Sequence, residues 1–181
     1  MTTTRGAARA APVATLIVFL VACGGDDDGS VDSRTGERSP VEPPAFVADI
    51  GDAIAAVEAE LGVGQSFFEV TANDQFTNVF VAVDDGTTAV PYLFVDGELQ
   101  PPAPAQPGAE GRTFAAGDVG FDPTMILSGV AADLPETSVD ALSVYGDGVG
   151  AVYVLGVTSS AGGELDIVVT SDGVIVSVDP L

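Results

Sequence analysis

Residues 45–83, AFVADIGDAIAAVEAELGVGQSFFEVTANDQFTNVFVAV, change from one apolar period to another within a single stretch. Apolar side chains first recur every three or four positions, which is typical of one stripe of an amphipathic helix. These side chains are Phe46, Ile50, Ile54, Val57 and Leu61. Gly62 then offers a C-terminal stop. Two apolar runs of strand character follow, at 67–71 and 78–83. The stretch therefore predicts a helix followed by β-strands.

Turn residues separate the next elements. Asp85-Gly86 predicts a hairpin turn before a third strand at 89–95, and Asp96-Gly97 predicts another before Glu98-Leu99. Pro91 has no N–H to donate, so its position inside the third run indicates a sheet edge or a bulge.

The same order of elements occurs again after residue 121. Asp122 is a good N-cap in front of Pro123. A shorter apolar stripe follows, made of Met125, Ile126, Val130 and Leu134. Strands are expected at 139–145, 151–158, 164–170 and 174–178. The sequence thus predicts an α+β fold made of two tandem α-β-β-β(-β) units that pack as one domain.

The spacing of the two units agrees with an internal repeat. Asp172-Gly173 follows Asp96-Gly97 by 76 positions (172 − 96), and Asp122 follows Phe46 by the same interval (122 − 46). A repeated unit usually cannot bury its own sheet face alone. Two arrangements are open: two sheets and two helices around a shared core, or strands merged into one longer sheet.

The composition excludes several kinds of chemistry. The 181 residues include 5 basic and 27 acidic side chains, one Cys and no His or Trp. All five basic residues are Arg. Without His there is no Ser-His-Asp or Cys-His catalysis, and one Cys allows no intrachain disulfide. Without Lys, Schiff-base and P-loop chemistry are also excluded.

The N-terminus has the pattern of an export signal. Residues 1–22 contain no acid, and their charged side chains are Arg5 and Arg9. Residues 10–22, AAPVATLIVFLVA, form an apolar run too short to cross a bilayer, which needs about 20 helical residues. A basic segment followed by such a run is typical of a secretory signal.

A lipid-modification motif ends this signal. Leu20-Val21-Ala22-Cys23, followed by Gly24-Gly25, resembles a bacterial lipobox. The resemblance implies that Cys23 receives a diacylglycerol thioether and that the chain is cut before it. The protein would then be anchored in the membrane by lipid on Cys23, at the outer face of the cell membrane. The alternative is a plain secretory signal, which would leave Cys23 as an unpaired thiol.

These features predict the following division of the chain. Residues 1–22 are the signal peptide, 23–44 the lipidated Cys and a disordered acidic tether, 45–100 the first α+β half, 101–120 a Pro/Ala/Gly-rich connector, and 121–181 the second α+β half. Asp26-Asp27-Asp28 in the tether lacks the ligand spacing of an EF-hand, so a solvated spacer is the better interpretation.

The charge restricts the partners. Cleavage before Cys23 leaves three Arg and 27 acids, a net charge of 3 − 27 = −24. Such a surface repels nucleic acid and anionic head groups, whereas cationic partners stay possible. The excess of acid is also explained by the compositional bias of a high-GC or salt-adapted organism.

Two hairpins carry a family resemblance. Residues 170–178, TSDGVIVSV, and more weakly 95–99, VDGEL, are similar to the closing hairpin of PepSY units. A helix on an antiparallel sheet, twice over, also resembles the tandem repeats of the β-lactamase inhibitor proteins. This resemblance implies a non-catalytic binding or inhibitory module outside the cytoplasm. Those inhibitors rely on disulfides that this chain cannot form, and no functional residue is carried over.

The remaining candidate sites are carboxylates and aromatic rings. Asp84, Asp85 and Asp147 could offer oxygen ligands to Ca²⁺, but no recognised loop surrounds them. The aromatic residues of the strands are expected to pack in the core. They are Phe67, Phe68, Phe80, Tyr92, Phe94, Tyr145 and Tyr153. Several of them on the outer face would instead form a ligand or protein patch.

We therefore expect a non-enzymatic module that binds an envelope protein, a peptide or a small apolar ligand, with no cofactor, metal or nucleic acid. One alternative is a carboxylate-dependent hydrolase, which would need two convergent acids of raised pKa in a deep cleft. The other is a lipid carrier, which would need an internal apolar cavity of roughly several hundred cubic ångströms.

Overall fold

The computed structural model describes residues 43–181. The predicted signal peptide, Cys23 and the tether up to residue 42 lie outside the described residues. No helix within 43–181 has the length and apolar character needed to cross a membrane.

Helix α1 (Phe46–Leu61) forms over the predicted stripe, but Leu61 at its end is 42% exposed and does not join the core. Its buried residues are Phe46, Val47, Ile50, Ala53, Ile54 and Val57, spaced so that they share one face. Gly62 ends the helix at a φ of 93°, and its N–H donates to the Glu58 carbonyl at 2.9 Å. A side chain with a Cβ rarely adopts this φ, which explains the glycine.

Helix α2 (Pro123–Asp133) begins as its cap residue predicts. The Asp122 carboxylate accepts hydrogen bonds from the N–H groups of Thr124 at 2.8 Å and Met125 at 3.3 Å. These bonds satisfy two of the N–H groups that have no partner inside the helix.

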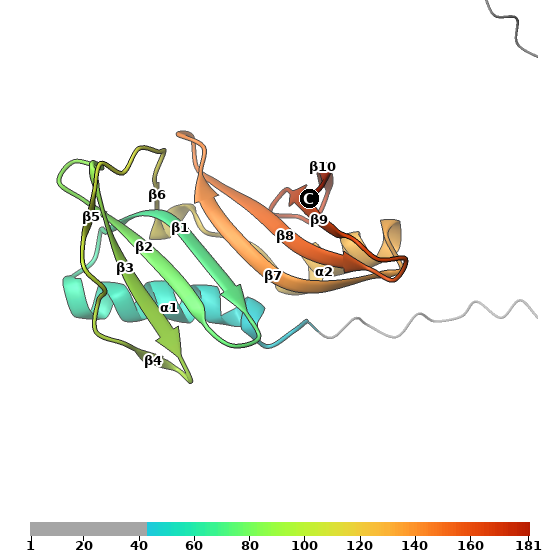
Figure 1. The fold of residues 1–181 in the computed structure, drawn as a ribbon, viewed down its shortest axis with the longest axis horizontal. Helices are drawn as coiled ribbons and strands as arrows, with labels where there is room; N and C mark the ends of the chain where they lie inside the picture. Colours follow the sequence, from blue (N-terminus) through green and yellow to red (C-terminus); the bar gives the residue numbers. More distant parts are fainter. Residues whose placement is uncertain (1–42) are drawn as a thin grey trace, which may run out of the picture. The chain divides into compact units, whose positions relative to one another are not determined.

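All strand pairs are antiparallel and belong to one sheet, in the order β10-β9-β8-β7-β1-β2-β3-β4 (Figure 1). The strands are β1 (Ser66–Asn73), β2 (Thr77–Val83), β3 (Thr88–Val95), β4 (Glu98–Leu99), β5 (Gln106–Pro107), β6 (Phe114–Ala115), β7 (Thr137–Gly146), β8 (Ala151–Ser159), β9 (Glu164–Val169) and β10 (Ile175–Pro180). The first strand of each predicted half, β1 and β7, pair with each other, with Thr71 opposite Ser143. The α+β class is therefore confirmed, and the strands merge into one longer sheet.

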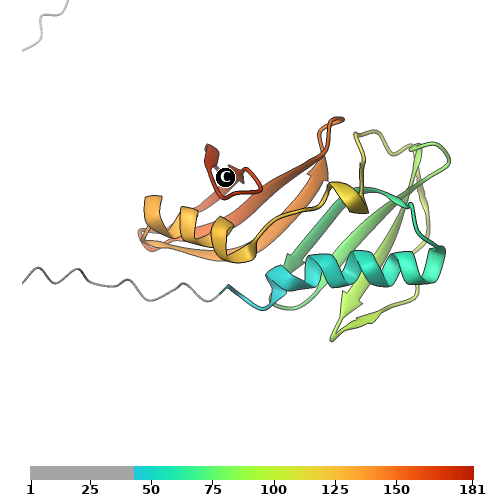
Figure 2. The same cartoon turned by 180° about the vertical axis from the view of Figure 1, so that it is seen from behind.

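Both helices lie on the same face of this sheet (Figure 2). The core between helices and sheet contains Ile50 of α1, Ile126 of α2, and Val70 and Leu142 of the central strands, all fully buried. Helix α2 is further positioned by a close approach of two backbones: a Cβ on Gly129 would lie 2.2 Å from the carbonyl oxygen of Gly173. Among residues 43–181, no helix covers the opposite face of the sheet.

The region predicted as a connector contains short elements. Strand β5 pairs with Thr88 and Ala89 at one end of β3, and β4 pairs with Phe94 and Val95 at the other. Pro91 lies between these two partners, so its missing N–H costs no ladder bond on that side. Of the two predicted alternatives, a sheet edge or a bulge, the position of Pro91 resembles an edge, although β3 pairs with β4 and β5 on either side of it. Strand β6 and a 3₁₀ turn, η1 (Ala116–Asp118), follow before α2.

Candidate functional site

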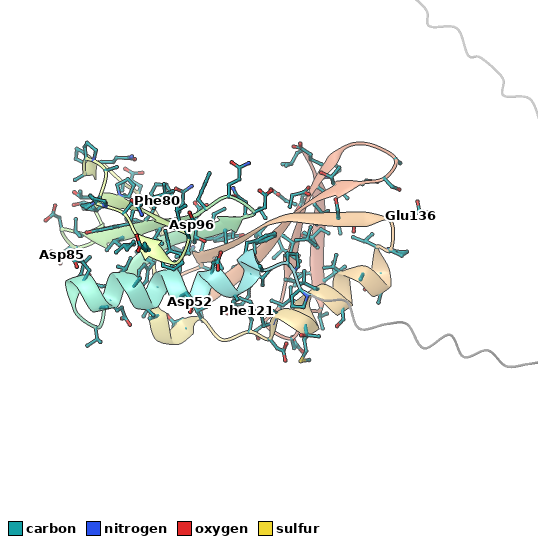
Figure 3. The ribbon with its side chains drawn as sticks, turned by 90° about the horizontal axis from the view of Figure 1, so that it is seen from below. Asp52, Phe80, Asp85, Asp96, Phe121 and Glu136 are labelled. Atoms are coloured by element: carbon teal, nitrogen blue, oxygen red, sulfur yellow. The ribbon has the colours of Figure 1, made fainter. Side chains whose placement is uncertain are left out.

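The aromatic side chains of the strands divide between the two faces of the sheet. Phe67, Tyr92, Phe94 and Tyr153 are at most 7% exposed and belong to the core. Phe68, Phe80 and Tyr145 do not, and Tyr145 is 37% exposed. The expectation that the aromatic residues pack in the core is therefore wrong for these three. Figure 3 shows Phe80 on the side of the sheet away from α1.

A β-bulge explains why two neighbouring residues of β1 both face outward. The register of β1 against β2 shifts between Phe67 and Glu69, so Phe68 is the extra residue. Strict alternation would put Phe67 inside, Phe68 outside and Glu69 inside again. The inserted residue instead places Phe68 and Glu69 on the uncovered face and returns Val70 to the core.

These outward residues line a hollow of about 370 Å³ on the uncovered face. Its floor is one cross-strand row in which Glu69 of β1 lies between Phe80 of β2 and Tyr145 of β7. The hollow is completed by Phe68 and Ala89 from the sheet and by the segment 109–112. We call it the aromatic hollow.

One hydrogen bond, from Thr71, orients the Glu69 carboxylate. The Thr71 hydroxyl lies 2.6 Å from Glu69 Oε1 and donates to it, and the same hydroxyl lies 2.8 Å from Ser143 Oγ on β7. Glu69 is half-buried, so its charge is less screened by water than that of a surface carboxylate. The side chain therefore presents a fixed negative charge between two aromatic rings.

One wall of the aromatic hollow is formed by backbone that crosses the end of β7. A Cβ on Gly146 would lie 2.4 Å from the carbonyl carbon of Thr113 and 2.8 Å from the carbonyl oxygen of Arg112. Only a glycine lets the two backbones approach this closely. Gly111 also lies near the ring of Phe68, with 3.4 Å from its Cβ position to Phe68 Cδ1, which is an ordinary van der Waals distance.

Arg112 is the one basic side chain among residues 43–181. Its guanidinium donates a hydrogen bond to the Asp147 carbonyl. The Asp147 carboxylate accepts hydrogen bonds from the N–H groups of Val149 at 2.7 Å and Gly150 at 2.9 Å. These backbone donors, together with the nearby Arg112 charge, lower the pKa of Asp147 below its ordinary value of 3.8.

The residues proposed as calcium ligands lie in separate turns. Asp84 and Asp85 occupy the β2–β3 turn with φ values of 53° and 56°, whereas Asp147 lies in the β7–β8 turn. No group of three Asp, Glu, His or Cys side chains within 43–181 is arranged to hold a metal ion. The calcium interpretation gains no support from this geometry. Cys23 lies outside the described residues.

The two alternative functions, a lipid carrier and a carboxylate-dependent hydrolase, each require a specific feature of the fold. A lipid carrier needs an empty space between helices and sheet, and that space is filled by the buried core cluster. A hydrolase needs two carboxyl groups in one cleft, and the aromatic hollow has Glu69 and Glu110 in its lining. Sequence reasoning singled out neither of these, nor Arg112. The signal for Glu69 was a charge inside an apolar strand run, between Phe68 and Val70.

Comparison with known proteins identifies a shared fold. No protein-family model matches the chain. No curated protein matches it either. Among solved structures, the crystal structure of a "putative lipoprotein" from Clostridium difficile 630 is similar, with a TM-score of 0.53 and 13% sequence identity. The match covers 77% of this chain and 95% of that chain. At this identity the similarity concerns the fold alone.

Proposed function

We propose that this chain is an exported, lipid-anchored protein of the outer face of the cell membrane, whose folded part is a non-catalytic binding module. Its ligand would be a protein, a peptide or a small apolar molecule, bound at the uncovered face of the sheet. The observation that carries the binding role is the aromatic hollow, in which Phe68, Phe80 and Tyr145 gather on a face that no helix of residues 43–181 covers.

Two observations support the anchor. Cys23 ends a basic and apolar N-terminal segment in a lipobox-like sequence. The similar fold from Clostridium difficile is itself described as a "putative lipoprotein". Each buried methylene of an acyl chain contributes about 0.8 kcal/mol, so two or three chains suffice to hold a domain at a bilayer.

Metabolic labelling tests the anchor. Cells that express the chain are fed an alkyne analogue of palmitate, and label and membrane fractionation are followed. The chain is expected to carry label and to sediment with membranes, whereas Cys23→Ser loses both. A label-free chain, or label that persists in Cys23→Ser, would contradict the anchor.

The binding role rests on the physical cost of exposed aromatic surface. Apolar rings gathered on an open face lose the hydrophobic stabilisation that burial provides, and such patches mark interaction sites. The volume of the aromatic hollow, about 370 Å³, lies in the range of ligand pockets. A bound partner would cover the rings that the fold itself leaves uncovered.

Site-specific photocrosslinking in living cells tests the binding face. Benzoylphenylalanine replaces Phe80 in the hollow or, as a control, Val63, which is 87% exposed in the α1–β1 connection. Illumination is expected to give a discrete adduct at position 80 and none at position 63. Mass spectrometry of the adduct then shows whether the ligand is a protein, a peptide or a small molecule. Equal adducts at both positions, or none at 80, would argue against this site.

The presence of Glu69 and Glu110 in one hollow favours a carboxylate-dependent hydrolase as the second candidate. A binding module holds the captured ligand intact whether or not these acids are present. A hydrolase would leave a cleaved ligand on the native chain and an intact one on the Glu69→Gln/Glu110→Gln double variant. Comparison of the two adduct masses separates the candidates.

We further propose that the two halves are tandem units of one repeat. The strand order supports this, because it runs outward from the central β1–β7 pair in chain order on both sides, β1-β2-β3-β4 and β7-β8-β9-β10. The turns at Asp96-Gly97 and Asp172-Gly173 also connect corresponding strands, β3 to β4 and β9 to β10.

A further inference from the structure

We propose that the aromatic hollow receives the guanidinium group of an arginine side chain presented by an extracytoplasmic partner protein. This proposal deepens the proposed function and rests on it, because it requires that the uncovered face is the binding face. It names the chemistry that the hollow recognises: a planar cation between Phe80 and Tyr145, paired with the Glu69 carboxylate.

The net negative charge of residues 43–181 favours a cationic ligand. Of the 27 acidic side chains, six precede residue 43, which leaves 27 − 6 = 21 acids against Arg112 alone. The summed field of such a charge distribution repels anionic ligands and raises the local concentration of cationic ones. A basic partner would therefore be attracted to this domain at a distance, before any contact forms.

The floor of the hollow supplies the local recognition. Phe80 and Tyr145 lie on the strands to either side of Glu69, in the same cross-strand row. A cation over an aromatic face is attracted by the negative ring face, and a carboxylate beside it adds an ion pair. Because the Thr71 hydroxyl fixes Glu69 Oε1, little side-chain freedom of the carboxylate is lost on binding.

Arg112 does not reverse this preference. Its guanidinium is held at the Asp147 carbonyl, at the turn beyond the end of β7, and the Asp147 carboxylate lies close enough for Arg112 to lower its pKa. Arg112 lines the hollow together with Glu69 and Glu110, so the charges of the lining sum to −1. Asp147, which lies outside the lining, offsets the Arg112 charge at the turn.

The geometry favours an arginine side chain of a protein over a free amine. Guanidinium is planar, stacks on aromatic rings and pairs with a carboxylate through two N–H groups, which an ammonium does not. The hollow opens on an uncovered sheet face, where a partner can also contact neighbouring residues such as Thr71 and Ser143. Arginine beside aromatic residues is a frequent hot spot of protein interfaces.

The test compares matched peptides on the full chain, isolated from membranes in a non-ionic detergent. The probes are blocked Gly-Arg-Gly, its neutral isostere Gly-citrulline-Gly, and Gly-Glu-Gly, each followed by amide chemical shifts in NMR titrations. The arginine peptide is expected to shift the amides around Glu69, Phe80 and Tyr145 and to bind at least about fivefold more tightly than the citrulline peptide. Added salt should reduce this difference.

Two variants give the control. Glu69→Gln removes the carboxylate of the hollow, whereas Asp85→Asn removes the same charge from the exposed β2–β3 turn. Arginine-peptide binding should fall about fivefold or more in Glu69→Gln and stay within twofold of native in Asp85→Asn. Tyr145→Leu provides a second test that leaves the carboxylate in place, and it should also weaken binding.

Three outcomes would overturn the proposal. The first is equal affinity for the arginine and citrulline peptides. The second is an equal loss of affinity for the arginine peptide in Glu69→Gln and Asp85→Asn. The third is a higher affinity for the acidic peptide, which would mean that the hollow binds anions through Arg112. A position-80 crosslink that persists with any of these would leave the proposed function intact. Absence of that crosslink would refute the binding face itself.

Discussion

The two faces of this sheet differ although they are built from the same strands. Next to each other on β1, Phe67 is fully buried in the core and Phe68 lines the aromatic hollow. Further along the strand, Val70 belongs to the core while Thr71 on the other face bonds Glu69 and Ser143. The covered face is apolar because the helices pack on it. The uncovered face carries polar side chains such as Thr71 and Ser143 beside apolar ones such as Val154, and the three outward aromatic rings gather on it around the candidate site.

The largest expected effect is a difference in stability between substitutions at two neighbouring residues, Phe67 on the covered face and Phe68 on the uncovered face. Phe67→Ala leaves a cavity beneath the helices and should reduce the free energy of unfolding by about 3–5 kcal/mol. Phe68→Ala removes a ring that is already in contact with water, so it should reduce the free energy of unfolding by less than about 1 kcal/mol. Urea denaturation of both variants checks the difference. Similar losses would mean that the bulge does not turn Phe68 outward.

A smaller effect is expected where the wall of the hollow meets the sheet. Gly146→Ala would place a methyl group 2.4 Å from the Thr113 carbonyl carbon, so one backbone must move. Overpacking of this kind costs about 1–3 kcal/mol. Gly150→Ala in the following turn is the matched control, because no atom of residues 43–181 beyond its own chain neighbours lies within 4 Å of its Cβ position. Thermal unfolding should show a clear loss for position 146 and a change within about 0.5 kcal/mol for position 150.

Replacement of two threonines by valine should change the free energy of unfolding in opposite directions. The Thr77 hydroxyl is buried and has no hydrogen-bond partner among residues 43–181, so Thr77→Val should raise the free energy of unfolding by about 1 kcal/mol. Thr71→Val on the uncovered face removes the hydroxyl that bonds Glu69 and Ser143 and should lower it by about 0.5–1.5 kcal/mol. Denaturant midpoints of the two variants should therefore move apart. A loss of stability in both would show that the Thr77 hydroxyl has a partner.

The smallest effect concerns the pH dependence of Asp147. Because folding lowers its pKa, the carboxylate stabilises the fold above its unfolded pKa, and this contribution disappears as pH falls through the folded pKa. Asp147→Asn should be less stable than the native chain at neutral pH and should approach it in strong acid. Carbon-detected NMR titration gives the pKa directly, and Asp85→Asn controls for net charge. A pKa at or above 3.8 would contradict the turn geometry.

Local sequence signals predicted most of the elements. The apolar period of 45–61 predicted α1, the cap at Asp122 predicted the start of α2, and the Asp-Gly pairs marked the turns that β4 and β10 follow. These features depend on residues within a few positions of one another, so periodicity and turn chemistry are enough to detect them. The lipidation of Cys23 stays a prediction.

The candidate site was not predictable in the same way. Its floor depends on the bulge after Phe67 and on the pairing of β1 with β7, which brings Glu69 and Tyr145 together across 76 positions of chain (145 − 69). Its wall depends on the contact of Gly146 with Thr113. Neither a one-residue register shift nor a contact between distant backbones leaves a periodic trace in the sequence.

By itself, the sequence determined the α+β class, the positions of most helices and strands, and the chemical groups available, since these follow from local periodicity and composition. Only the tertiary structure decided that the strands form one sheet, that both helices cover the same face, and that Phe68, Phe80 and Tyr145 remain outside. The reason is physical: which side chain faces the core depends on strand register, and register is set by packing between segments far apart in the chain.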